Sequence, residues 1–458
     1  MIKSISLQNF KCWEHIDDLQ FAQLTGFFGT NSSGKTSLLE FLLLLKQTVQ
    51  SADRKQVLNF GSERDYVELG SYDDMVFNHE YDRSFSFQIE LQNDSKFEIK
   101  DTTSKANVIL TSNEITFSCK ISRAKAKRLY VNELSYNVEN LRFNMRKQEK
   151  DRYNYRISSE TTDKTKNPIK LIRTSGRPWD LPEPIKYYGF PDQVRTYYQN
   201  AGFFFDLQLI FEKAFSNIYY LGPLRDYPKR QYTWTGSEPY DMGRRGENFV
   251  DAILAARENG DKIPTERFQP NLSLEEYIAL LLKNMGLIHS FSIEEIASNS
   301  NLYRVWVKKN VDSSKVLLTD VGFGVSQVLP VIALCYYVPK KSTIIIEQPE
   351  IHLHPKIQAA LADVFIDAIN KRDIQIILES HSEHLLRRLQ LRIAEEKLKS
   401  KEVSLYFADN INESSRLTHL DIDLFGNINN WPKDFFGDEF SDILAMNEMI
   451  IKRKRSKK

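Results

Sequence analysis

The stretch that decides the fold lies near the amino terminus and reads Gly29-Thr30-Asn31-Ser32-Ser33-Gly34-Lys35-Thr36. It matches the G-x-x-x-x-G-K-T pattern of a phosphate-binding loop. The apolar run Leu24-Thr25-Gly26-Phe27-Phe28 precedes it and is typical of a buried strand, and a helical run from Ser37 to Leu45 follows it. Strand, glycine-rich loop and helix in this order form the setting that the motif requires, so the stretch predicts a nucleoside-triphosphate site.

Each position of the loop has a chemical reason. Glycines at both ends allow a tight turn whose N–H groups point at phosphate oxygens, and the helix that follows adds its positive dipole end. We expect Lys35 to reach the β- and γ-phosphates and Thr36 to hold Mg²⁺ through its hydroxyl. The predicted nucleotide contacts of the loop are Gly29, Asn31, Ser32, Ser33, Gly34, Lys35, Thr36 and Ser37.

Length and charge limit the class of protein. With 458 residues the chain is long enough for two or three domains. Lys plus Arg number 62 and Asp plus Glu number 61, so the chain lacks the overall basic field of many nucleic-acid binders. The basic block at Lys452–Lys458 is either a solvated tail or a phosphate-binding tail.

Cysteines and apolar runs indicate the compartment. The three cysteines are widely spaced and match no metal pattern, which is typical of a reducing, cytoplasmic environment. The longest apolar run, residues 38–45, is far too short to span a membrane, and the start of the chain alternates like a strand rather than a signal peptide. We therefore expect a cytoplasmic protein without a membrane partner.

The pattern of the sequence divides the chain into five segments. Residues 1–80 form the lobe with the phosphate loop, and residues 81–160 alternate apolar and polar side chains as an antiparallel β subdomain does. We assign residues 161–300 to a mostly helical insert and residues 301–440 to a second lobe of alternating strands and helices. Residues 441–458 are expected to form a helix and the basic tail.

Two local patterns lie inside the insert. The aromatic-dense stretch from Tyr187 to Phe205 is typical of a core, with a partner interface as the alternative. A helix is predicted at 274–285, because Ser273 and Glu276 form a capping box and Gly286 is a stop signal.

The acidic partner of the phosphate loop comes far downstream. Thr343-Ile344-Ile345-Ile346 ends in Glu347, the pattern of a Walker B strand, so we expect Glu347 to hold the Mg²⁺ shell. A second strand, Ile374–Leu378, is followed by Glu379-Ser380-His381, where a γ-phosphate-sensing histidine belongs. Between the two halves, the turn in Leu318–Gln327 opens an apolar helix and offers a second anion-binding helix N-terminus.

Together these motifs resemble ABC-type ATPases of the SMC/RecF/OLD-like group, and more narrowly the bacterial AAA family ATPases that carry a C-terminal domain of unknown function. The resemblance covers nearly the whole chain and is weakest in the middle. The stretches that carry it are Ile5–Lys11, Gly322–Gln327, Glu347–Glu350 with the His-Leu-His-Pro that follows, and Ser380–His384. Tyr220–Arg225 and Asn430-Trp431-Pro432 with Phe435-Phe436 also fit the narrower family.

The resemblance implies an α/β fold: a P-loop ABC-type ATPase head with an antiparallel β subdomain and a helical insert. It also implies a homodimer or higher homo-oligomer of heads, with ATP and Mg²⁺ between one head's phosphate loop and the other head's signature turn. Thr319, Gly322 and Ser326 are the candidates for that turn, which departs from the usual Leu-Ser-Gly-Gly-Gln. His381 takes the switch-histidine role.

One departure from the family pattern affects the chemistry. The general base in such ATPases is usually the acid directly after the Walker B acid, and here Gln348 occupies that position. An amide orients a water but does not accept its proton. The predicted catalytic residues are therefore Glu347, Gln348, Glu350 and His381, with Glu350 as the substitute base and slow hydrolysis as the alternative.

Three functions compete for these motifs. The favoured one is an ATPase that controls a separate effector protein, with a nuclease as first candidate, because the ATPases of bacterial anti-phage systems of the Septu or PARIS type resemble this chain. The second is a RecF-like DNA repair ATPase, against which the balanced charge argues. The third is a nucleotide-gated scaffold with little hydrolysis, which Gln348 suggests. DNA or a phage component is a further candidate partner.

Smaller alternatives concern single clusters. His352, His354, His381 and His384 have zinc-like spacings, but the ATPase pattern already explains most of them. Asp421-Ile422-Asp423 resembles the D-x-D of a Toprim nuclease, although too little chain follows for such a domain. Gly70–Asp74 lies where a lid would contact the nucleotide, and an ordinary turn explains it equally well.

Overall fold

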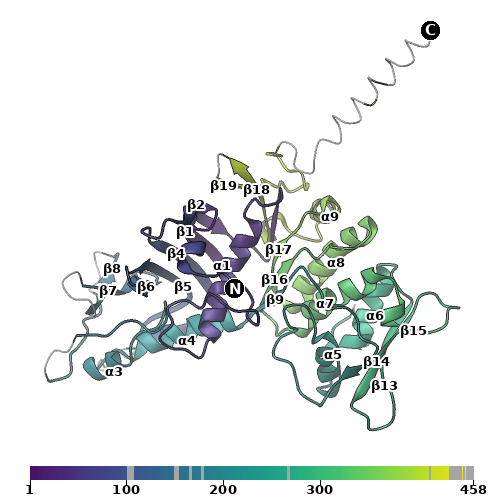
Figure 1. Cartoon of the computed structure of the whole chain (residues 1–458), viewed down its shortest axis with the longest axis horizontal. Helices are drawn as coiled ribbons and strands as arrows, with labels where there is room; N and C mark the ends of the chain where they lie inside the picture. The colour runs from purple at the N-terminus through teal and green to yellow at the C-terminus, as the bar shows by residue number, and fades with distance from the viewer. Residues whose placement is uncertain are drawn as a thin grey trace.

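Two large sheets organise the molecule (Figure 1). The computed structural model describes residues 1–100, 108–148, 154–163, 168–176, 180–265, 269–411 and 414–432, with Met446 and Met449. The predicted tail, apart from these two methionines, and the Phe435-Phe436 pair lie outside the described residues. No helix in the described part of the chain is long and apolar enough to cross a bilayer.

The central sheet has six strands in the order β19-β18-β3-β17-β16-β9, and all but β19 are parallel. The strands are β3 (Leu24–Gly29), β9 (Ile218–Leu221), β16 (Thr343–Glu347), β17 (Gln375–Glu379), β18 (Val403–Ile411) and β19 (Ser414–His419). Since parallel strands end at the same edge, this order brings together segments that are hundreds of residues apart. The carboxyl edge receives Gly29, Glu347 and Glu379, and the segment after Leu221 starts there.

The second sheet is antiparallel, in the order β2-β1-β4-β5-β6-β7-β8, as the period-two alternation predicts. Its strands are β1 (Ile2–Phe10), β2 (Trp13–Gln20), β4 (Phe85–Lys100), β5 (Val108–Arg123), β6 (Leu129–Val138), β7 (Leu141–Lys147) and β8 (Tyr155–Thr161). One face is apolar and buried, and the other carries polar side chains.

Helix α1 (Lys35–Gln50) lies between the two sheets (Figure 1). Its leucines are buried all around the helix, which is what a helix covered on both sides requires. Phe41 packs against Phe10, Phe85 and Phe87 of the antiparallel sheet, with ring centroids 5.3 to 6.3 Å apart. Helix α1 therefore holds the phosphate loop rigidly against both sheets.

The aromatic stretch is core, as predicted. Tyr187, Phe190 and Phe204 are buried against the antiparallel sheet, together with helix α4 (Gly202–Ser216), which α3 (Gln193–Tyr197) precedes. The segment assigned to a helical insert also supplies β9 to the edge of the central sheet. Tyr219 and Tyr220 thus lie in the main sheet.

Helices α5 to α9 lie on the opposite side of the central sheet, and a small antiparallel sheet packs on the outer side of these helices (Figure 1). The helices are α5 (Phe249–Glu258), α6 (Leu274–Asn284), α7 (Phe323–Tyr337), α8 (Pro355–Arg372) and α9 (Glu383–Ala394). The sheet contains β10 (Tyr232–Thr233), β13 (Ser290–Glu295), β14 (Leu302–Lys308) and β15 (Val316–Leu317). The predicted cap of α6 is confirmed, because Ser273 and Glu276 form the reciprocal capping box and Gly286 has φ 75°.

Short elements complete the described chain. They are α2 (Tyr72–Met75), β11 (Lys262–Ile263), β12 (Leu272–Ser273) and the 3₁₀ turns η1 (Phe77–His79), η2 (Leu318–Asp320) and η3 (Ser400–Glu402). The turn at Gly70–Asp74 is an ordinary capping turn, since Asp74 accepts hydrogen bonds from the Ser71 N–H at 2.8 Å and hydroxyl at 2.6 Å. Its second acid, Asp73, pairs with Arg123 at 3.2 Å.

Candidate nucleotide-binding site

The phosphate loop runs from the end of β3 to the start of α1, and two of its positions require glycine. Gly29 has φ 137° and Gly34 has φ 88°. A Cβ at Gly29 would lie 2.0 Å from the carbonyl oxygen of Ala408, and one at Gly34 would lie 2.5 Å from Cys12 Sγ. No side chain caps the first turn of α1, so its N–H groups point into the loop as a ready anion site.

Lys35 is buried in the middle of this loop, with 3% of its surface exposed. Its Nζ donates to the carbonyl oxygens of Gly29 at 3.2 Å and Thr30 at 2.6 Å, and to Ser33 Oγ at 3.4 Å. Burial lowers the pKa of Lys35, and the negative charges of Glu379 and Glu350 oppose this shift. The loop thus presents a buried cation held by neutral oxygens, which a phosphate can replace.

The other predicted loop residues have clear positions. Ser33 is buried and its hydroxyl donates to the Thr30 carbonyl at 2.8 Å, whereas Asn31 and Ser32 are exposed. Ser37 Oγ lies 3.8 Å from Cys12 Sγ. Two contacts fix the loop from outside: Trp13 Nε1 donates to the Gly34 carbonyl at 3.1 Å, and Asn410 Nδ2 donates to the Ser32 carbonyl at 3.0 Å.

Two carboxylates face the start of α1 from the ends of neighbouring strands. The register of β16 and β17 pairs Glu347 with Glu379, and Thr36 donates its hydroxyl hydrogen to Glu379 Oε2 at 2.8 Å. Glu347 Oε1 accepts a hydrogen bond from Tyr220 at 2.8 Å. Burial raises the pKa of Glu347 to about 7, with a further rise from the charge of Glu379, and burial also raises the pKa of Glu379.

A third carboxylate and the predicted switch histidine meet beside this pair. Glu350 is buried, and its Oε1 accepts the backbone N–H of His381 at 2.6 Å. Burial raises the pKa of Glu350, while the hydrogen bond from the His381 N–H opposes the rise. His381 Nε2 lies 4.0 Å from Glu379 Oε1, and burial followed by the charge of Lys35 lowers the pKa of His381, so its ring is neutral at pH 7.

Gln348 occupies the tight turn between these acids. Its φ is 43°, its side chain is half-buried, and its N–H donates to the Glu379 carbonyl at 2.8 Å. This turn brings Glu350 back to the strand end. The structure therefore places all four predicted catalytic residues, Glu347, Gln348, Glu350 and His381, at or just after the carboxyl ends of β16 and β17.

The predicted signature residues lie in η2 and at the start of α7. Gly322 begins α7 without a side-chain cap and is exposed, and Thr319 is half-buried in η2 with its hydroxyl 3.2 Å from Asp320 Oδ1. The Ser326 hydroxyl donates to the Phe323 carbonyl of its own helix at 2.8 Å. Among the described residues, none of these three hydrogen-bonds to the phosphate loop of its own chain. Their role toward a second head remains a prediction.

The residues around Thr36 fit a magnesium ion. Mg²⁺ prefers oxygen ligands and is usually held by one or two side chains together with substrate phosphates. The hydroxyl of Thr36 and the carboxylates of Glu347 and Glu379 supply such oxygens. Burial and the nearby charge of Glu379 both raise the pKa of Glu347, and a bound cation would relieve this strain on the two carboxylates.

Three residues of the site were not predicted from the sequence. Glu379 closes the strand Gln375–Glu379 as Glu347 closes its own, a signal that was available in the sequence. Tyr220 and Arg225 contact Glu347 from the end of β9, Arg225 through the Glu347 carbonyl at 3.1 Å. The only signal for these two residues in the sequence was that they belong to the family-like stretch Tyr220–Arg225, because no local pattern predicts that β9 pairs with β16.

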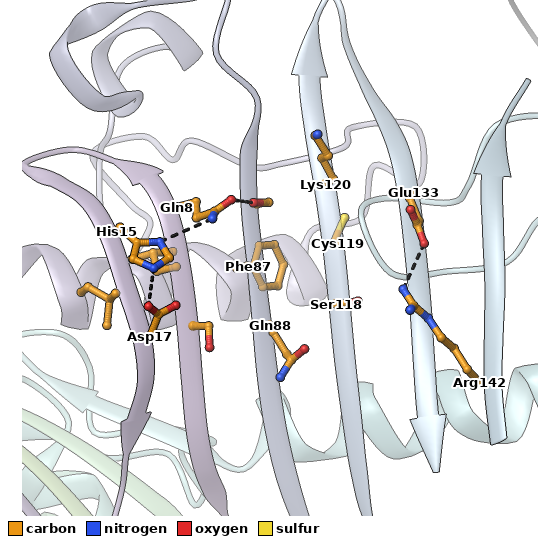
Figure 2. Close-up of a pocket in the computed structure, with 14 residues that line it drawn as sticks. Gln8, His15, Asp17, Phe87, Gln88, Ser118, Cys119, Lys120, Glu133 and Arg142 are labelled. Carbon is orange, nitrogen blue, oxygen red and sulfur yellow. Dashed lines mark hydrogen bonds and ion pairs between the residues drawn. The ribbon is translucent and has the colours of Figure 1, made fainter. Parts of the chain in front are cut away.

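Two other clusters offer no competing site. The described residues contain no group of three or more His, Cys, Asp or Glu side chains that could hold a metal by themselves, so the zinc hypothesis for His352, His354, His381 and His384 gains no support from the geometry. A pocket of about 230 Å³ opens on the polar face of the antiparallel sheet (Figure 2). His15 pairs with Asp17 there and Glu133 with Arg142, and no phosphate-loop residue lines it.

Comparisons with solved structures give distant similarity. A structure titled "SMC head domain from Thermotoga maritima" is 10% identical, with a TM-score of 0.40 over 92% of this chain and 99% of that chain. An Smc head from Pyrococcus furiosus bound to the C-terminal domain of ScpA is 8% identical, with a TM-score of 0.44 over 98% and 99%. A search of curated proteins found no match.

Family models match most of the chain. "AAA ATPase domain" matches residues 1–201, and "Protein of unknown function (DUF3696)" matches residues 398–446. "AAA domain, putative AbiEii toxin, Type IV TA system" matches residues 136–387, more than half of the sequence, and this range contains the Walker B strand and His381. With its phosphate loop, parallel central sheet and antiparallel subdomain, the protein is an α/β ATPase head of the AAA type, and it belongs to the family described as AAA domain, putative AbiEii toxin, Type IV TA system.

Proposed function

We propose that the protein binds Mg-ATP at the edge of the central sheet and hydrolyses it. The observation that carries this proposal is the convergence of Lys35 and Thr36 with three buried carboxylates and a neutral histidine. These groups come from the start of α1, from the ends of β16 and β17 and from the segments that follow these strands.

The residues of the site have separate proposed roles in binding the phosphates and the metal. The α1 N–H groups and Lys35 bind the β- and γ-phosphates, and His381, beside Lys35, contacts the γ-phosphate. Thr36 and Glu347 hold the metal, with Glu379 as a further oxygen ligand. When bound, Mg²⁺ supplies positive charge that neutralises the phosphate oxygens.

Glu350 is the proposed general base. Water attacks the γ-phosphorus, the bond to the bridging oxygen breaks, ADP leaves with the electron pair, and the proton of the water passes to Glu350. Burial raises the pKa of this carboxyl toward neutrality, which suits a base. Gln348, whose side chain is half-buried, orients the water.

We further propose that ATP joins two heads and that this assembly controls a separate effector. The exposed start of α7 supports this, because Gly322 is open and its helix N-terminus is uncapped and free for another chain's nucleotide. A nuclease effector in anti-phage defence is the working hypothesis, and it rests on the family resemblance alone.

The test is steady-state hydrolysis of Mg-ATP by the purified chain, beside Lys35→Ala and Glu350→Gln. Turnover that disappears in both variants supports an ATPase in which Glu350 replaces the missing acid. Turnover that survives in Glu350→Gln contradicts that role. Tight Mg-ATP binding without turnover favours the second candidate, a nucleotide-locked scaffold, which Gln348 at the usual base position supports.

Size-exclusion chromatography with light scattering tests the assembly. A shift from monomer to dimer on adding Mg-AMP-PNP, lost in Gly322→Glu, supports the sandwich of heads, since the added carboxylate repels phosphate. A mass that does not change with nucleotide contradicts it.

A further inference from the structure

The segment after β9 carries a buried arginine with most of its hydrogen-bonding capacity unused. Arg225 is 6% exposed, and its Nη2 donates to the Glu347 carbonyl at 3.1 Å. Its Nε and Nη1 are buried and have no hydrogen-bond partner. A buried donor that is left unpaired destabilises the fold, and more so when it is charged, so such groups need an explanation.

An unused acceptor lies in the same site. Glu350 Oε1 accepts the His381 N–H, whereas Glu350 Oε2 is buried without a partner. The charges of Glu347 and Glu350 both act on Arg225, so the free donors and the free acceptor are electrostatic neighbours. The unpaired N–H donors and the unpaired carboxylate oxygen lie beside the proposed base, which indicates that water and phosphate form the missing hydrogen bonds during the reaction.

The loop that carries Arg225 is firmly anchored. Gly222 N–H donates to the Arg244 carbonyl at 2.8 Å, and Asp226 N–H donates to the Arg245 carbonyl at 3.0 Å. Directly after these carbonyls, Gly246 packs so closely on α7 that an added Cβ would lie 2.5 Å from Pro330. The segment that carries Arg225 thus contacts the end of β16, and the segment that anchors it packs on α7.

We infer that Arg225 is a positioning residue for ATP hydrolysis, which fixes the Glu347–Glu350 turn through the Glu347 carbonyl and whose free N–H groups hold the attacking water beside Glu350. This inference rests on the proposed hydrolysis. A guanidinium suits the task because its rigid planar fork holds a carbonyl and a second group in a fixed relative orientation, which the freely rotating donors of an ammonium do not impose.

Kinetics of Arg225→Met and Arg225→Lys test the role, with Arg372→Met as the matched control. Arg372 also donates to a backbone carbonyl, that of Val338, and also has an unpaired buried Nε, but it lies at the opposite edge of the sheet. We expect Arg225→Met to lower kcat about 10- to 100-fold and to change KM for ATP less than about threefold, with Arg372→Met near wild type. In a Glu350→Gln background, Arg225→Met should add less than about twofold, because both act through one carboxylate.

Several results would overturn the inference. Additive losses in the Arg225→Met, Glu350→Gln double variant would show that Arg225 acts apart from Glu350, and a kcat equal to that of Arg372→Met would show no role. If Arg225→Met does not fold, Arg225→Lys decides, since wild-type kcat in this charge-preserving variant excludes a need for the fork. Wild-type protein without Mg-ATP turnover overturns the proposed function, and the role of Arg225 with it.

Discussion

Helix α1 buries two lysines, and the contrast between them separates a binding group from a structural one. Lys35, at the first turn, is held by carbonyl and hydroxyl oxygens. Lys46, three turns later, has no exposed surface and no hydrogen-bond partner for Nζ, which lies 4.9 Å from the ring centre of Tyr66 and 5.8 Å from that of Tyr219. A phosphate can take over the hydrogen bonds of Lys35, whereas aromatic faces keep Lys46 in place.

The largest expected effect is on Lys35. Lys35→Met should reduce Mg-ATP turnover more than about 100-fold, the usual loss when a donor to the developing charge is removed. It should also abolish the rise in Tm that saturating Mg-AMP-PNP gives wild type, a stabilisation of about 2.7 kcal/mol at 100 times Kd. Lys46→Met is the control within the same helix and should keep turnover within about twofold. Equal losses in both variants would contradict the division of roles.

Glu379 should come next. Glu379→Gln keeps an acceptor for Thr36 but removes a charge beside the metal site, so we expect turnover to fall about 10-fold and half-maximal activity to need more Mg²⁺. A magnesium titration of the rate measures both. Glu395→Gln, at the end of α9, is the control. An unchanged magnesium requirement would remove Glu379 from the metal shell.

Lys46 should affect stability instead. Burial lowers its pKa from 10.5 to about 8, a cost of about 3 kcal/mol for the charged form, and the tyrosine rings return about 1–2 kcal/mol. Lys46→Met should therefore raise the free energy of unfolding by about 1–2 kcal/mol at pH 7, measured by urea denaturation. Destabilisation by more than about 1 kcal/mol would mean that the tyrosine cage stabilises the ammonium.

The smallest effect is the pH dependence of that difference. Between the folded pKa of about 8 and the ordinary value of 10.5, the unfolded chain binds the Lys46 proton and the folded chain does not, so wild-type stability rises with pH. The advantage of Lys46→Met should shrink by about 1 kcal/mol between pH 8 and pH 9. Urea curves of both proteins at each pH isolate this contribution, and a constant difference would show that Lys46 does not titrate there.

The sequence predicted the parts of the site that are local. The phosphate loop has its own glycines and its own helix, and Glu347 and His381 each follow a short apolar strand, so motif and periodicity located them. The antiparallel sheet was equally readable, because Phe85, Phe87 and their successors alternate with polar residues.

The rest depends on strand order, which no local pattern encodes. Arg225 and Tyr220 reach Glu347 only because β9 pairs with β16, at the edge of a sheet whose middle strand comes from residues 24–29. A four-residue strand inside a segment of helices and prolines gives no hint of this pairing. The signature residues are the opposite case. The sequence predicts them, but their predicted partner belongs to another chain.

The position of β3 has a consequence for biosynthesis. Its neighbours are β17 and β18, and the Ser32 carbonyl is held by Asn410, 378 residues away. While the ribosome is still translating the middle of the gene, the phosphate loop has therefore neither flanking strand, and ATP cannot help the nascent amino-terminal half to fold. Nucleotide can therefore stabilise the loop only near the end of translation, whereas the antiparallel sheet covers one side of α1 much earlier.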